Sequence, residues 1–117
     1  CVINGDGLTT RDYVHVSDVA TAFALAAERG HGLVNVGSGV DRSVLDVHAA
    51  LSRAVGNELP PVFGPPLPGE VRRVRLDVRL AEERLGWRPS VGIEDGMTTV
   101  IDWLRAEGAA MAGTGDR

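Results

Sequence analysis

Lysine is absent from this chain of 117 residues, and its twelve side chains of fixed positive charge are all arginine. Cysteine occurs once, at Cys1, which excludes an internal disulfide and fits a reducing compartment. No apolar run approaches the roughly 18 residues of a membrane span. The first residues also lack the basic-then-apolar pattern of a secretory signal peptide. These absences predict a cytoplasmic protein with no membrane partner.

Composition disfavours two further classes of function. The formal net charge of −4 argues against a nucleic-acid partner, which needs a basic surface. The three histidines, His15, His31 and His48, are spaced too irregularly for a zinc site, so no metal is expected. The 44% hydrophobic and 24% charged fractions suit one globular domain.

The chain begins CVINGDG, without an initiator methionine and in a pattern typical of the middle of a strand. We therefore expect a piece of a longer protein. A processed small protein is the alternative.

Hydrophobic periodicity predicts an α/β fold with four helices and about four short strands, without a full parallel sheet. Strands are expected at residues 1–3, 13–16 and 33–36, and extended segments at 59–69 and 71–76. Helices are expected at residues 19–29, 44–55, 78–85 and from 93 to near 108. The expected helix starts are Ser17 or Asp18, a Ser43–Asp46 capping box, and Asp77. Residues 109–117, rich in small side chains, are expected to form a flexible tail.

Two Gly-x-Gly pieces, residues 5–7 and 37–39, invite comparison with a dinucleotide-binding loop. Thr10 and Arg42 stand where the third glycine belongs, and no acidic residue ends a second expected strand about 20 residues on. Both pieces are therefore weak indications, and ordinary tight turns explain the first. The second could still lie beside a ligand, because glycine lets backbone amides approach closely.

Several arginines lie in turns or extended segments, outside the helix faces where charge is merely solvated: Arg11, Arg72, Arg73 and Arg75. The planar guanidinium group suits a diphosphate, because it forms bidentate, charge-assisted hydrogen bonds. The alternative is that each is a surface or ion-paired arginine. Asp6 and Asp12 are expected to accept from local amides, as turn carboxylates usually do, rather than to form a catalytic pair.

Four motifs occur in the order GDG-x-x-x-RDY-x-HV-x-D-x-A, NVGSG-x-x-x-SVLDV, PGEVRR and AEERLGW-x-P. Together they resemble the C-terminal portion of the extended short-chain dehydrogenase/reductase family, which contains NAD-dependent nucleotide-sugar epimerases and dehydratases. The resemblance covers residues 2–107. Within the family, residues 10–16 and 39–47 look most like the UDP-glucose 4-epimerases.

The resemblance implies that residues 1–108 form a nucleotide-sugar-binding lobe whose Rossmann core is missing. It places Arg11 at the diphosphate of the nucleotide sugar, Val40 near the base or ribose, and Glu70 where an acidic residue approaches the nucleotide. Relatives often carry a second diphosphate-binding arginine at the position of Leu67. Here Arg72 or Arg73 would substitute for it, or the pocket is altered.

In the family, a tyrosine assisted by a lysine deprotonates the sugar while NAD accepts a hydride. This chain has no lysine, and its only tyrosine, Tyr13, is followed four residues later by Ser17. The resemblance therefore implies an inactive fragment that binds no cofactor itself, from a parent that uses NAD. The implied partners are a nucleotide sugar, a UDP-hexose above all, the missing Rossmann domain, and a second copy of the chain. A dTDP- or UDP-sugar dehydratase fragment and a non-catalytic stand-alone binding domain are the alternatives.

Overall fold

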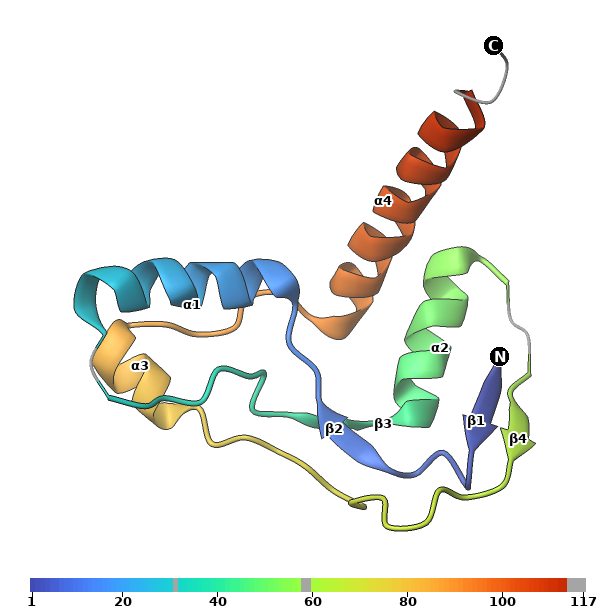
Figure 1. Ribbon diagram of the computed structural model, residues 1–117, viewed down its shortest axis with the longest axis horizontal. Coiled ribbons are helices and arrows are strands. Elements are labelled where there is room, and N and C mark those ends of the chain that lie inside the picture. Colours follow the sequence, from blue (N-terminus) through green and yellow to red (C-terminus); the bar gives the residue numbers. More distant parts are fainter. Residues whose placement is uncertain (31, 58–59, 114–117) are drawn as a thin grey trace.

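The computed structural model describes residues 1–30, 32–57 and 60–113, which form four helices and four short strands (Figure 1). Their order is β1 (Val2–Asn4), β2 (Thr10–Asp12), α1 (Val16–Arg29), β3 (Asp41–Ser43), α2 (Val44–Val55), β4 (Val62–Gly64), α3 (Arg79–Leu85) and α4 (Ile93–Gly113). The predicted α/β class, with few and short strands, is confirmed.

The strands form two separate two-stranded sheets. Strand β1 pairs with β4 in parallel, with Ile3 opposite Phe63, and β2 pairs with β3 in antiparallel, with Arg11 opposite Arg42. The segment after β4 returns along the lower edge of the molecule in Figure 1 and reaches β2, where Thr10 and Arg73 form an isolated bridge. Three segments far apart in the sequence therefore meet at β2.

The buried apolar side chains gather mainly between α1 and α3. Ala22 of α1 packs with Ala81, Leu85 and Trp87, and partly buried residues close the cluster. The Trp87 Nε1–H donates to the backbone oxygen of Asp18 at 2.9 Å, so its polar atom is satisfied inside the core. On the other side of the molecule, α2 packs against α4 (Figure 1).

Local chemistry sets most helix ends as predicted. Ser43 and Asp46 form a reciprocal capping box at the start of α2. Gly56 and Gly86 adopt left-handed conformations at the ends of α2 and α3, where a side chain would be strained. Gly30 ends α1 in an extended conformation.

The first helix and the strand before it differ from the prediction. The strand is Thr10–Asp12 rather than 13–16, because the pairing partners lie beside residues 10–12. The cap of α1 is His15, whose Nδ1 accepts from the Ser17 amide, and not Ser17 or Asp18. Asp18 is instead buried and accepts hydrogen bonds from another part of the chain.

Residues 33–36 form no strand, although their pattern predicted one. Within the described residues no strand lies beside them to complete a ladder, and Leu33 is 91% exposed. A strand needs a hydrogen-bonding neighbour as well as a suitable pattern.

Two boundaries near the C-terminus are also corrected. Helix α4 continues to Gly113 rather than ending near Gly108, so that part of the predicted tail is helical. The remaining predicted tail, 114–117, lies outside the described residues. Helix α3 begins at Arg79 after a Val78 cap, although Asp77 does accept from the Arg79 amide at 3.1 Å. Among the helices of the described part, none is both long and apolar enough to cross a membrane.

Candidate functional site

Arg11 lies in the middle of β2, and its guanidinium group is held at two points. Nη1 donates to the backbone oxygens of Thr10 at 2.8 Å and Val71 at 2.7 Å. Nη2 lies 3.4 Å from Oε1 of Glu70. The side chain is 32% exposed, so the group is oriented by the backbone and still reaches solvent. A guanidinium held in this way retains donors for a ligand.

The Glu70 carboxylate faces the same region. Its Oε2 accepts from the hydroxyl of Thr9 at 3.4 Å, and Thr9 is itself buried. The structure therefore brings Arg11 and Glu70 together, from segments that are 59 residues apart in sequence. Both contacts to Glu70 are long, so this carboxylate is only weakly held.

An open cleft of about 460 Å³ lies beside Glu70. Polar side chains line much of it, and Leu67 stands on its wall where relatives are expected to carry arginine. The lining residues are Asn4, Gly5, Asp6, Thr9, Gly64, Pro66, Leu67, Glu70 and Arg72.

The two arginines expected to replace the missing one are both paired. Arg72 donates two hydrogen bonds to the Asp6 carboxylate, at 2.8 and 3.3 Å. Arg73 does the same to Asp41, at 2.7 and 3.2 Å. The Leu8 amide and then Arg72 lower the pKa of Asp6, while Arg73 is the main cause that lowers the pKa of Asp41. Arg72 reaches the cleft, but neither guanidinium lacks a partner.

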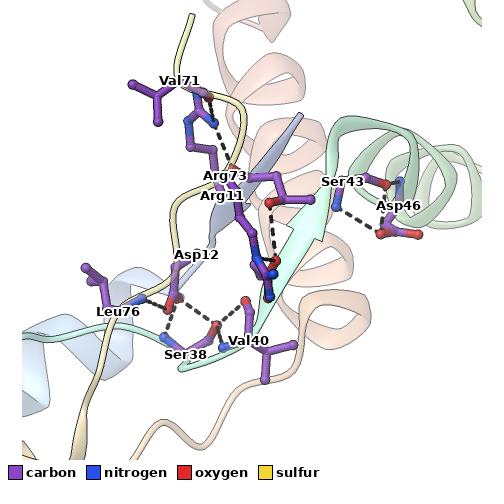
Figure 2. A network of polar contacts seen from close by, with 11 residues as sticks. Arg11, Asp12, Ser38, Val40, Ser43, Asp46, Val71, Arg73 and Leu76 are labelled. Atoms are coloured by element: carbon purple, nitrogen blue, oxygen red, sulfur yellow. Dashed lines mark hydrogen bonds and ion pairs between the residues drawn. The ribbon is translucent and has the colours of Figure 1, made fainter. Parts of the chain in front are cut away.

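Asp12 joins three segments next to Arg11, as Figure 2 shows. Its Oδ1 accepts from the amide and hydroxyl of Ser38 at 2.6 and 2.7 Å. Its Oδ2 accepts from the amides of Gly39 at 2.9 Å and Leu76 at 3.2 Å. The expectation that Asp12 accepts from local amides is wrong, because all four donors come from distant segments. The only sequence signal for this role was its place beside Arg11 in the RDY motif.

Val40 lies over a second, smaller hollow. This space, of about 210 Å³, adjoins Tyr13 and the segment that precedes α4. Its lining residues are Tyr13, Ser38, Val40, Arg42, Pro89, Ser90, Val91, Gly92 and Ile93. Val40 is 48% exposed, its amide donates to the Ser38 hydroxyl, and that hydroxyl lies 2.9 Å from its backbone oxygen. Val40 and Glu70 thus lie at two different depressions.

The Gly37–Gly39 loop does not fit a dinucleotide. The amides of Ser38 and Gly39, which would have to face a pyrophosphate, donate to Asp12 instead. A Cβ at Gly37 would lie 3.1 Å from Oδ2 of Asp12 and closer still to Leu76, so packing explains this glycine. Gly7 likewise adopts φ +70° against Leu45. Neither glycine loop therefore fits the pyrophosphate of NAD.

Within 1–30, 32–57 and 60–113, no three His, Cys, Asp or Glu side chains are grouped to hold a metal ion. The Nε2 atom of His15 is buried without a hydrogen-bond partner in that part of the chain. Its other nitrogen accepts from the Ser17 amide, so the helix cap accounts for the placement of the ring.

A family model described as GDP-mannose 4,6 dehydratase matches residues 1–100. The chain belongs to the NAD-dependent epimerase/dehydratase family. This membership agrees with the α/β lobe described above and assigns it to the C-terminal part of the family fold.

Relatives of this epimerase/dehydratase chain include several UDP-glucose 4-epimerases. The enzyme from Mycolicibacterium smegmatis is 44% identical over 88% of this chain and 34% of its own length. The crystal structure of UDP-glucose 4-epimerase from Thermotoga maritima with UDP-glucose is 38% identical, with a TM-score of 0.86 over 91% of this chain and 35% of that one. The Bifidobacterium longum UDP-glucose 4-epimerase in complex with NAD⁺ and UDP is 30% identical, with a TM-score of 0.80 over 88% of this chain and 32% of that one. The chain thus spans about a third of the length of the relatives it matches.

Proposed function

We propose that this chain is the nucleotide-sugar-binding part of an NAD-dependent epimerase of the UDP-glucose 4-epimerase type. The observation that carries the proposal is the placement of Arg11. It is fixed by two carbonyl oxygens, remains partly exposed, and contacts Glu70, which lines an open cleft. A bidentate donor oriented in advance is what recognition of a diphosphate requires.

The named ligands of the relatives support the same class of substrate. The Thermotoga maritima enzyme was solved with UDP-glucose, and the Bifidobacterium longum enzyme with UDP. In this proposal Arg11 contacts the diphosphate, Val40 lies by the base or ribose, and Glu70 approaches the nucleotide. Arg72 and Arg73 act indirectly, because they hold Asp6 and Asp41 around the cleft and β3.

The role of these 117 residues is binding rather than chemistry. The family reaction uses NAD with a tyrosine–lysine pair, and no lysine occurs in this chain. Because neither glycine loop fits the pyrophosphate of NAD and the tyrosine–lysine pair is missing, hydride transfer would need residues outside this sequence. The parent would accordingly combine this lobe with a Rossmann domain that carries the cofactor.

Titration of the isotope-labelled chain with UDP tests the proposal. Binding of half a pocket should be weak, near millimolar, or about 4 kcal/mol. Chemical shifts should change at Arg11, Val40 and Glu70. Arg11→Ala should lose roughly 1.5–3 kcal/mol, which makes binding undetectable, and Arg11→Lys should recover only part. Arg84→Ala removes an exposed arginine on α3 and serves as the matched control.

The alternatives give different results in the same titration. A chain from a dTDP-sugar dehydratase would bind dTDP more tightly than UDP. A stand-alone interaction domain would bind neither nucleotide. Identical UDP shifts in wild type and Arg11→Ala would show that Arg11 merely pairs with a surface carboxylate, and the assignment to the diphosphate would be wrong.

A further inference from the structure

Arg42 of β3 lies directly opposite Arg11 of β2 in the antiparallel pair. Residues at such positions point to the same face of the ladder, with Cβ atoms about 4.5–5.5 Å apart. Two like charges placed opposite one another are destabilising unless a counter-charge lies near them. Glu70, whose Oε1 lies 3.4 Å from Nη2 of Arg11, supplies part of that counter-charge. Because the register adds a second arginine to the same face, a further anion would still be stabilised there.

The carboxylates around Arg42 are already engaged. Hydrogen bonds from Ser43 lower the pKa of Asp46, with a smaller contribution from Arg42. Arg53 is the main cause that lowers the pKa of Glu94, and Arg42 again adds a smaller contribution. Asp46 belongs to the capping box of α2, and Glu94 forms an ion pair with Arg53.

Arg42 itself is exposed and forms no ion pair in the part of the chain that the structure describes. It differs in this from Arg72 and Arg73, whose guanidinium groups are each held by two hydrogen bonds. Of these three arginines, Arg42 is therefore the one that can turn to a ligand without breaking a salt bridge.

The surroundings of Arg42 fit a nucleotide as well as an anion. It lines the hollow of about 210 Å³ together with Tyr13 and Val40. An aromatic and an apolar side chain offer a flat, uncharged surface to a base or ribose, while Arg42 borders that surface with positive charge. Arg11, opposite Arg42 on the neighbouring strand, adds a second positive charge next to this surface.

We infer that Arg42 is the second diphosphate-binding arginine of this chain, acting with Arg11 in place of the residue that Leu67 has replaced. The inference rests on the proposed function, since the anion is taken to be the diphosphate of a nucleotide. It changes the expectation that Arg72 or Arg73 makes this contact.

Two probes, UDP and inorganic pyrophosphate, are titrated against the 117-residue chain and observed by NMR at the arginine side chains. Pyrophosphate and UDP should both shift the Nε–H signals of Arg11 and Arg42. Arg42→Ala should weaken the binding of each probe about tenfold or more, as expected for loss of a charge-assisted contact. Arg42→Lys should recover part of it. The control Arg84→Ala, at an exposed position on α3, should leave the Arg42 shifts in place.

The outcomes separate this inference from the proposed function. If UDP binds and requires Arg11 but is indifferent to Arg42→Ala, the function stands and the inference is overturned. If pyrophosphate binds through both arginines while UDP gains nothing over it, the anion clamp stands and the nucleotide assignment fails. If neither probe shifts either arginine, both are overturned.

The melting temperature of the chain without ligand distinguishes ligand binding by Arg42 from a purely structural role. If Arg42 binds a ligand, Arg42→Ala removes one of two opposed like charges, and the melting temperature should be unchanged or raised, most clearly at low salt. A lowered melting temperature, with unchanged affinity for both probes, would mean that Arg42 only supports β3.

Discussion

At the scale of single residues, carboxylates organise the region around Arg11. Asp12 joins the loop at Ser38 and Gly39 to the extended segment at Leu76. Asp41 accepts from Arg73 and from the Thr10 hydroxyl, and so fastens the extended segment to β3 and β2. A ligand-binding arginine needs such a support, because small displacements of its strand would move the guanidinium group.

Asp12 offers a test of this support. Asp12→Asn keeps the shape but turns an amide group toward donors that now lack an acceptor, so the free energy of unfolding should fall by about 1–3 kcal/mol. Urea unfolding measures the change, and UDP binding should weaken with it. Asp102→Asn, an exposed site on α4 with an ion pair of 3.7 Å, is the matched control. Equal stability of the two variants would show that the four hydrogen bonds to Asp12 contribute nothing.

At the scale of elements, the start of α1 is fastened to the segment that precedes α4. The buried carboxylate of Asp18 accepts from the amide and hydroxyl of Ser90, at 3.0 and 2.6 Å, and from the Val91 amide at 3.0 Å. Burial raises the pKa of Asp18, but these hydrogen bonds lower it more, so it lies below its ordinary value of 3.8. One side chain thus fixes the position of two helices that share few other contacts.

This fastening should depend on pH with a definite sign. Because the folded-state pKa of Asp18 is lowered, its contribution to stability is complete well above 3.8 and is lost as the pH falls through the folded-state value. Asp18→Asn should cost about 1–3 kcal/mol near neutral pH, and the difference from wild type should shrink as the medium is acidified. Denaturant unfolding from about pH 6 down to about pH 2.5 measures it. A difference that stays constant over this range would contradict the account.

At the scale of the whole molecule, the chain is open and its core is small. The radius of gyration is 17.5 Å, whereas a compact domain of about this length has about 13 Å. Six apolar side chains are buried in the described residues, while Phe23, Leu33 and Trp103 are 73%, 91% and 60% exposed. Large apolar side chains are therefore exposed on several elements of the chain rather than gathered in one core.

We expect the isolated chain to be marginally stable and to self-associate through this apolar surface. The weight-average mass in sedimentation should rise with protein concentration, and a dye for apolar surface should bind. Phe23→Ser should reduce both effects, because Phe23 is exposed on α1 and outside the buried cluster. Ala22→Ser, at a neighbouring buried position, would instead lower stability without relieving association. A monodisperse monomer at high concentration, with no bound dye, would contradict the expectation.

Sequence patterns correctly predicted the elements whose start, apolar face and end are determined by residues close together in the chain. The α2 helix was found because its capping box, apolar face and closing glycine all lie within residues 43–56. The elements that were misplaced depend on partners elsewhere. Residues 33–36 have the pattern of a strand but no neighbour in the described part, and β2 lies earlier than predicted because β3 and Arg73 pair with it there.

The candidate site divides in the same way. The RDY motif was enough to single out Arg11, since a motif is a local feature that a resemblance can identify. That Arg72 and Arg73 are occupied by Asp6 and Asp41 could not be predicted, because each ion pair joins segments more than thirty residues apart. The same is true of the four donors that converge on Asp12.

The sequence by itself therefore determined the family, the order of the helices and their capped ends. It also determined the arginine most suited to a diphosphate. Each of these features depends on residues that are close together in the chain. Tertiary structure decided which arginines are engaged, which glycine amides face a carboxylate rather than a ligand, and which arginine stands opposite Arg11. The residue opposite Arg11 is determined by strand register, which is set by pairing between strands that are distant in the chain. In the sequence, Arg42 stands out only where a third glycine would be expected; the fold places it across from Arg11.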